Sequence, residues 1–140
     1  MPVSYLPIAG VRGHRVGDDG SVWTCLFRVS RGVGQGSFFI ETWGWRRRKL
    51  SPDKKGYLRV TVPLEGGGSV RAKVHHLVLA AFEGPKPEGQ ECRHLDNVKT
   101  NNARGNLCWG TPEENREDSK RISPRRTLQT RNAERKKRLG

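Results

Sequence analysis

The sequence predicts an α+β fold, in which a small N-terminal antiparallel β-sheet module precedes a β-β-α unit and a basic C-terminal arm. Two observations carry this prediction. Short stretches that alternate apolar and polar residues, separated by turns rich in Gly and Pro, fill the first half of the chain, and this pattern is typical of strands. Gly is also frequent, with 17 occurrences in 140 residues, which favours many short elements over a helical bundle.

The N-terminal half is expected to form hairpins. A turn signal at Asp18-Asp19-Gly20 precedes a strand that begins at Ser21. The Gly-rich stretch from Arg28 to Ser37 is expected to be a flexible hairpin tip. The alternation from Tyr57 to Val62 predicts a strand, and Val70 to Val74 is expected to pair with it across a Gly-rich turn.

Two short helices are expected in the second half. His75 to Phe82 is rich in apolar residues and ends before a Gly-Pro pair, as helices commonly do. Short strands around Cys92 and Leu107 are expected to bracket a polar loop. Thr111 is a suitable N-cap for the second helix, because Pro follows it at the first helical position and Glu114 stands where a capping box needs it.

Positive charge is concentrated in two segments. The net charge is +13, of which Trp43 to Val60 contributes +6 and Lys120 to Gly140 contributes +8, so the rest of the chain is close to neutral. Such a distribution is typical of proteins that bind nucleic acid. The side chains expected to contact it are Arg46, Arg47, Arg48, Lys49, Arg59, Arg125 and Arg126. Trp43 and Trp45 could either reach toward the nucleic acid or pack under the sheet, and the sequence does not place them.

Several functional classes are not indicated. No apolar run approaches the roughly 18 residues of a membrane span, and the first ten residues lack the features of a signal peptide. The three cysteines, Cys25, Cys92 and Cys108, form no CxxC pair, so neither a disulfide framework nor a structural zinc site is expected. We therefore expect a cytoplasmic protein without membrane association.

Three residues stand where phosphodiester hydrolysis would need them. His94 lies at the end of the first strand of the β-β-α unit, Asn106 lies twelve residues later, and Asn115 lies twenty-one residues past His94 in the first turn of the helix. A histidine titrates near neutrality and can activate water, and an amide oxygen can hold a hard cation. The Asn106 amide can instead bond backbone groups of the loop. The spacing predicts that a base and a cation ligand meet in one cleft.

Several sequence blocks of this unit occur in a recognisable order and spacing. They are Val74 to Val78, Phe82 to Pro85, Arg93 to Asp96, Gly105 to Thr111, and Glu114-Asn115 with Asp118. Together they resemble the HNH (ββα-metal) endonuclease family, in particular its phage and intron homing-endonuclease branch. The resemblance implies a nuclease that uses Mg²⁺ or Mn²⁺ and no small-molecule cofactor. His94 would be the general base, Asn106 a structural residue and Asn115 a metal ligand.

The resemblance also implies a partner and a division of the chain. Gly17 to Trp23 and Gly56 to Leu58 resemble the small DNA-binding module that often precedes such nucleases. The expected segments are a DNA-binding module at 1–68, the nuclease unit at 69–121 and the basic arm at 122–140. Double-stranded DNA is the expected substrate, in a bacterial or phage-infected cell. A monomer has one active site, so nicking is the simpler expectation, whereas a dimer could cut both strands.

One residue departs from the family pattern. Many members carry Asp or His immediately before the general base as a second metal ligand, whereas this chain has Arg93, which cannot bind a cation. Either Asn115 holds the metal together with waters and DNA phosphates, or another side chain helps. Asp118 lies on the same helical face as Asn115 and is one candidate. Asp96 and His75 are the alternatives, and His75 is also a candidate for supporting the site without binding metal. Arg93 itself could contact the scissile phosphate.

Two other functions compete with the nuclease. A nucleic-acid-binding protein that keeps the HNH fold but has weak or no turnover is consistent with Arg93. An RNA-binding protein of ribosomal type is suggested only by the size and basic character of the chain. Metal-dependent nicking of a plasmid separates the nuclease from both.

Overall fold

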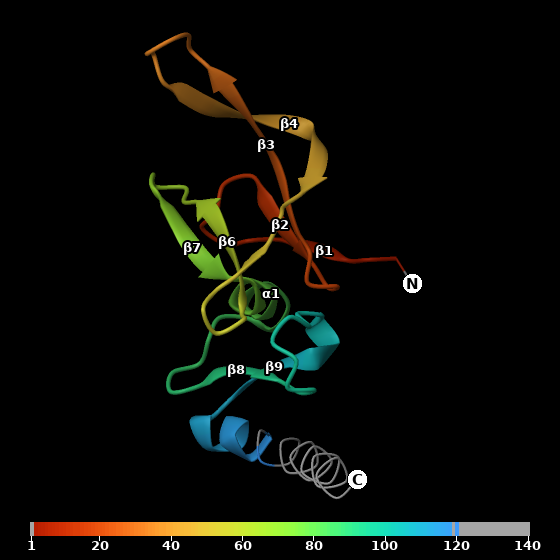
Figure 1. The fold of residues 1–140 in the computed structure, drawn as a ribbon. Helices are drawn as coiled ribbons and strands as arrows, with labels where there is room; N and C mark the ends of the chain where they lie inside the picture. Colours follow the sequence, from red (N-terminus) through yellow and green to blue (C-terminus); the bar gives the residue numbers. More distant parts are fainter. Residues whose placement is uncertain (1, 119, 121–140) are drawn as a thin grey trace, which may run out of the picture.

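The computed structural model describes residues 2–118 and 120, and the basic arm at 122–140, with Arg125 and Arg126, lies outside them. The described part contains three antiparallel sheets and short helices (Figure 1). The predicted α+β class is confirmed. None of the described helices is long and apolar enough to cross a membrane.

The first sheet has four strands in the order β1-β2-β3-β4, and neighbouring strands are antiparallel. They are β1 (Tyr5–Pro7), β2 (His14–Gly17), β3 (Val22–Ser30) and β4 (Ser37–Arg47). The hairpin of β3 and β4 extends away from the rest of the molecule as a two-stranded ribbon (Figure 1). Its tip is shorter than predicted, because Val29 pairs with Phe38 and Ser30 with Ser37 inside the stretch expected to be loop.

The second sheet contains the hairpin that the alternation predicts. Its strands, in spatial order, are β5 (Ser51–Pro52), β6 (Leu58–Pro63) and β7 (Ser69–Lys73), and Val60 pairs with Ala72. Helix α1 (Val74–Glu83) follows β7 directly. Because α1 begins at the end of a strand, its buried face continues the core that the hairpin starts.

A β-β-α unit follows α1. Strands β8 (Glu91–His94) and β9 (Leu107–Gly110) are antiparallel, with Glu91 opposite Gly110 and His94 opposite Leu107, and the short 3-10 helix η1 (Arg104–Asn106) precedes β9. Helical residues 112–118 come next. The predicted capping box is present: the Glu114 N–H donates to Thr111 Oγ1 at 3.2 Å, and the Thr111 N–H donates to Glu114 Oε1 at 3.2 Å.

One hydrophobic core joins the N-terminal sheets to α1 and β9. Its fully buried members include Val16 and Val22 from the first sheet, Val62 from the second, and Leu79 from α1, and Leu107 of β9 completes it. The first sheet is therefore packed on the same core as the β-β-α unit. A boundary at residue 68 falls within the turn between β6 and β7, so the two segments share structure while their functional division stays a prediction.

Candidate active site

His94 ends strand β8 and faces helix α1. Its ring centroid lies 5.1 Å from that of His75 and 5.9 Å from that of Tyr57, and 8% of the residue is exposed. Side chains alternate between the two faces of a strand, and Cys92, two residues earlier, packs against the core on the same side. The strand period thus directs His94 inward, with one edge of its ring left near the surface.

The two ring nitrogens of His94 have different surroundings. Nε2 lies 2.9 Å from Oδ1 of Asn102, and because that oxygen can only accept, the hydrogen resides on Nε2. Within the described residues, Nδ1 has no hydrogen-bond partner, and this atom is not fully buried. The Nδ1 lone pair therefore reaches solvent, where it can accept a proton from water.

His75 lies against His94 as a neutral group. It is 4% exposed, and burial, followed by repulsion from His76 and His94, lowers the pKa of His75 to about 3. Its Nδ1 is buried and has no hydrogen-bond partner within the described part of the chain. His75 thus supports one side of the His94 ring without placing a positive charge there at neutral pH.

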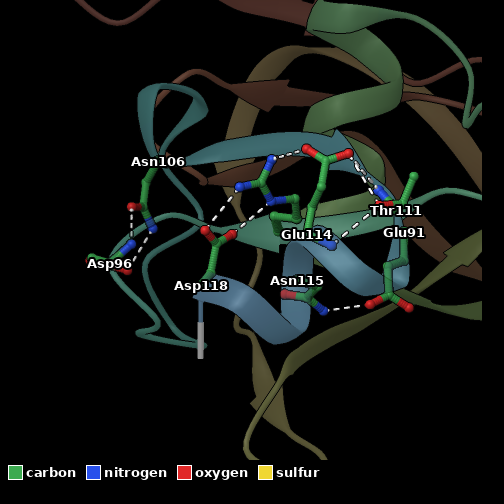
Figure 2. A network of polar contacts seen from close by, with 8 residues as sticks. Glu91, Asp96, Asn106, Thr111, Glu114, Asn115 and Asp118 are labelled. Atoms are coloured by element: carbon green, nitrogen blue, oxygen red, sulfur yellow. Dashed lines mark hydrogen bonds and ion pairs between the residues drawn. The ribbon is translucent and has the colours of Figure 1, made fainter. Parts of the chain in front are cut away.

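Asn106 closes the loop that follows His94. Its Oδ1 accepts from the backbone N–H of Asp96 at 3.0 Å, and its Nδ2 donates to Asp96 Oδ1 at 2.8 Å (Figure 2). The same Nδ2 also donates to the Asn101 carbonyl at 2.9 Å. The Asp96 carboxylate also accepts from the Val98 N–H and from Asn101 Nδ2. Asn106 and Asp96 are therefore engaged with the loop itself.

Arg93 points to the opposite face of β8, where it joins the strand to the helix. Its Nε and Nη2 donate to the two carboxylate oxygens of Asp118 at 2.6 and 2.9 Å, and its Nη1 donates to Glu114 Oε2 at 2.9 Å (Figure 2). Gly110 makes room for this path, because a Cβ there would lie 2.2 Å from Cδ of Arg93. The two residues considered for phosphate and metal binding, Arg93 and Asp118, are thus each other's partners.

Asn115 lies in the first turn of the helix, beside the beginning of β8. Its Nδ2 donates to Glu91 Oε1 at 2.5 Å, so the oxygen end of the amide is turned away from Glu91 (Figure 2). Sequence reasoning missed Glu91 and Asn102 as partners of the proposed metal ligand and base. The available signals were weak: Glu91 shares a strand face with Arg93, and Asn102 belongs to an Asn-Asn pair in a polar loop.

The donor atoms around the site suit a hard cation. Within residues 2–118 and 120, no group of three or more His, Cys, Asp or Glu side chains is arranged to hold a metal ion. Mg²⁺ needs few protein ligands, since it keeps several waters and binds substrate phosphates. Asn115 offers an amide oxygen, whereas burial raises the pKa of the Cys92 thiol to about 12 and keeps this soft donor protonated.

A comparison with protein families agrees with this arrangement. Residues 72–117 match the family described as HNH endonuclease, and this stretch spans α1, the β8–β9 pair and the helix that carries Asn115. Residues 72–117 are therefore an HNH endonuclease segment. The resemblance predicted from the sequence blocks is confirmed. No curated protein matches the chain significantly.

A solved structure concerned with DNA binding and cleavage by the HNH homing endonuclease I-HmuI is similar to this chain over a longer stretch. The TM-score is 0.63 and the sequence identity is 27%, over 86% of this chain and 59% of that chain. This chain thus spans about three fifths of the length of that structure. The likeness includes the N-terminal sheets as well as the HNH unit, because residues 72–117 alone are too few to give that coverage.

Basic residues surround Tyr57, which lies beside His94. Lys73 Nζ is 5.7 Å and Lys99 Nζ is 5.0 Å from the centroid of the Tyr57 ring. An open depression next to it is lined by Asp53, Lys54, Lys55, Tyr57, Arg59, Arg71 and Lys73. Arg59 is held there by Asp53, whose Oδ2 lies 3.0 Å from Nε. A positively charged surface therefore leads to the candidate base of the HNH unit.

The arginine-rich end of β4 divides into exposed and internal side chains. Arg46, Arg47 and Lys49 are exposed, although Arg46 Nη2 also donates to the Leu26 carbonyl. Arg48 donates to His14 Nε2 at 2.6 Å and to the Thr61 carbonyl at 2.8 Å, and so bridges the first two sheets. Trp43 is fully exposed on the ribbon, and the ring of Trp45 carries the Arg15 guanidinium 4.3 Å from its centroid.

Proposed function

We propose that this protein is a metal-dependent endonuclease that hydrolyses phosphodiester bonds of double-stranded DNA and nicks one strand. The observation that carries the proposal is the state of His94. Its hydrogen resides on Nε2 and its Nδ1 lone pair reaches solvent, at the end of the first strand of an HNH unit. A base in this state can take a proton from the attacking water.

The remaining site residues have supporting roles in this proposal. Asn115 would hold Mg²⁺ or Mn²⁺ through its amide oxygen, and Glu91 orients that amide by accepting from its nitrogen. The bound cation would neutralise charge on the phosphate and the leaving oxygen. Asn106 keeps the loop after His94 closed. His75, which stays neutral at pH 7, packs against His94 and limits its movement.

Asp118 and Arg93 act together in this proposal. Asp118 already accepts two hydrogen bonds from Arg93, so we assign the metal to Asn115 and treat the ion pair as the link between β8 and the helix. Arg93 is then available to phosphate only through the part of its side chain that is exposed, which is 17%.

DNA would lie along the ribbon and the basic depression. A two-stranded antiparallel ribbon can enter a DNA groove, and the exposed Arg46, Arg47 and Lys49 would contact phosphates. Arg59 and its neighbours around Tyr57 would continue this track to His94. Arg48 would contribute by holding the sheets together, because its guanidinium is bonded within the protein. Arg125 and Arg126 are proposed to add phosphate contacts from outside the described residues.

A second candidate is a DNA-binding protein with little or no turnover. The observation in its favour is that the position before His94 carries an arginine and that this arginine occupies the carboxylate of Asp118. Both candidates predict DNA binding, so only cleavage distinguishes them.

Plasmid nicking tests the proposal directly. Wild-type protein is expected to convert supercoiled plasmid to the open-circular form with Mg²⁺ or Mn²⁺ and to stop when EDTA is added. His94→Ala should bind DNA normally and lose roughly 10²–10⁴ in rate, because it lacks the general base. Wild-type-level nicking by His94→Ala would remove the assigned base, and a wild-type protein that binds DNA without cutting it would favour the second candidate.

A further inference from the structure

Asn102 makes a contact that stability alone does not explain. It is 4% exposed, its Oδ1 accepts from His94, and its Nδ2 is buried with no hydrogen-bond partner among the described residues. A buried amide with an unpaired donor is costly to folding, so an apolar side chain would suit the packing better. The contact with His94 is therefore the feature that distinguishes an asparagine here.

The turn between strands β2 and β3 of the N-terminal sheet contacts Asn102. A Cβ on Gly20 would lie 2.8 Å from both the carbonyl carbon and oxygen of Asn102, so the two backbones touch. Two residues further along, the Arg104 N–H donates to the Asp18 carbonyl at 2.8 Å. The turn between β2 and β3 thus lies directly on the loop that carries Asn102.

This turn is itself held by several hydrogen bonds. The Gly17 N–H donates to the Ser21 carbonyl at 2.8 Å, and the Gly20 N–H donates to the Gly17 carbonyl at 3.0 Å. Asp19 accepts from both the N–H and the hydroxyl of Ser21. Gly20 has a φ of 85°, a conformation that glycine adopts easily. These hydrogen bonds therefore fix the conformation of the turn that contacts Asn102.

We propose that Asn102 is the positioning residue that sets the tautomer of His94, and that the turn at residues 17–21 holds Asn102 in place. The inference rests on the proposed nuclease function. It makes the N-terminal sheet part of the catalytic apparatus, since the sheet reaches the base through one intermediate residue. Binding of DNA to the sheet and the alignment of His94 are then carried by the same packed structure.

A pair of glycine variants tests the support from the turn. Gly20→Ala and Gly10→Ala both place a side chain at positive φ, at 85° and 73°, but a Cβ on Gly10 meets nothing within 4 Å. In Gly20→Ala the 2.8 Å contact must open by roughly 0.6 Å to reach an ordinary 3.4 Å, which displaces Asn102. A displacement of about 1 Å can cost about 10²-fold in rate. We expect kcat for nicking to fall roughly tenfold to a hundredfold in Gly20→Ala and to stay near wild type in Gly10→Ala.

A substitution of Asn102 tests its relation to the base. Asn102→Asp keeps an acceptor at Nε2 but adds a negative charge that favours the protonated imidazole, so the acidic limb of the pH–rate profile should move to higher pH. Asn102→Ala should lower kcat and leave KM for DNA unchanged. The titratable groups Tyr57, His75 and Asp96 near His94 are unchanged in these variants. Asp18 and Asp19, in the turn that contacts the Asn102 loop, are unchanged as well.

Nuclear magnetic resonance separates this inference from the proposed function. In full-length protein labelled with ¹⁵N-histidine, and with His94 assigned by His94→Gln, we expect the Nε2–H tautomer in wild type and in Gly10→Ala, and a mixture in Asn102→Ala. This readout needs no activity, so it decides the inference even if the protein cuts no DNA. An Nδ1–H tautomer in wild type would overturn the inference. Equal rate losses in Gly20→Ala and Gly10→Ala would overturn it as well, if thermal unfolding shows that both variants are folded.

Discussion

Replacement of Arg93 by methionine removes the cation that joins β8 to the helix carrying Asn115. Methionine keeps most of the aliphatic stem, so the passage across Gly110 stays filled, but the Asp118 carboxylate loses two hydrogen bonds and the positive charge of Arg93. The side chain of Asp118 is 7% exposed, so water cannot readily replace the guanidinium. The variant therefore leaves a buried charge without its Arg93 partner.

The size of the effect follows from the exposure of each arm. Breaking a buried ion pair by removing one partner costs about 3–5 kcal/mol, and because Arg93 keeps 17% exposure we take the lower end, about 3 kcal/mol. The ion pair between Arg93 and Glu114 adds under about 1 kcal/mol, since half of the Glu114 side chain is exposed. For a domain of this size, a loss of about 3 kcal/mol lowers Tm by roughly 10 °C.

Urea and thermal unfolding, followed by circular dichroism, measure this loss. Glu114→Gln is the matched control, because it weakens only the exposed ion pair with Arg93 and keeps a residue that can complete the capping box. The double variant Arg93→Met/Asp118→Leu should recover part of the lost stability, since it removes the buried carboxylate that has lost Arg93. A loss in Arg93→Met no larger than that in Glu114→Gln, or a double variant less stable than Arg93→Met, would refute the reasoning.

Three further outcomes are expected. Asn115→Ala should lower nicking, and raised Mn²⁺ or Mg²⁺ should restore part of it, because the change weakens metal affinity and leaves the base; activity indifferent to chelation would contradict this. Asn106→Ala removes three hydrogen bonds from the loop after His94, so Tm and activity should fall together, and an unchanged Tm would speak against its structural role. His75 has a pKa lowered to about 3, so the unfolded chain binds its proton first and the free energy of unfolding should fall as pH drops from about 6.5 toward 3; in His75→Phe this slope should be shallower, and an equal slope would exclude His75 as its source.

The local helices and strands, and the spacing of the candidate catalytic residues, follow from the sequence alone. The β6–β7 hairpin, α1 and the capping box of the last described helix follow from alternation, apolar content and cap residues, which act within a few residues of one another. The blocks around His94 and Asn115 were enough to predict the HNH family, since their order and spacing are properties of the chain. The role of each residue in them stays a proposal.

Which side chains meet depends on packing between distant segments. Arg93 and Asp118 are 25 residues apart and pair because the helix folds back over β8 across a glycine. Gly20 reaches Asn102 because both sheets and the β-β-α unit share one core. Arg48, whose neighbours are exposed, turns inward because His14 and Thr61 offer acceptors there. In each case the outcome depends on the facing of a strand or the path of a loop, and these are set by packing between segments distant in sequence rather than by the residues nearby.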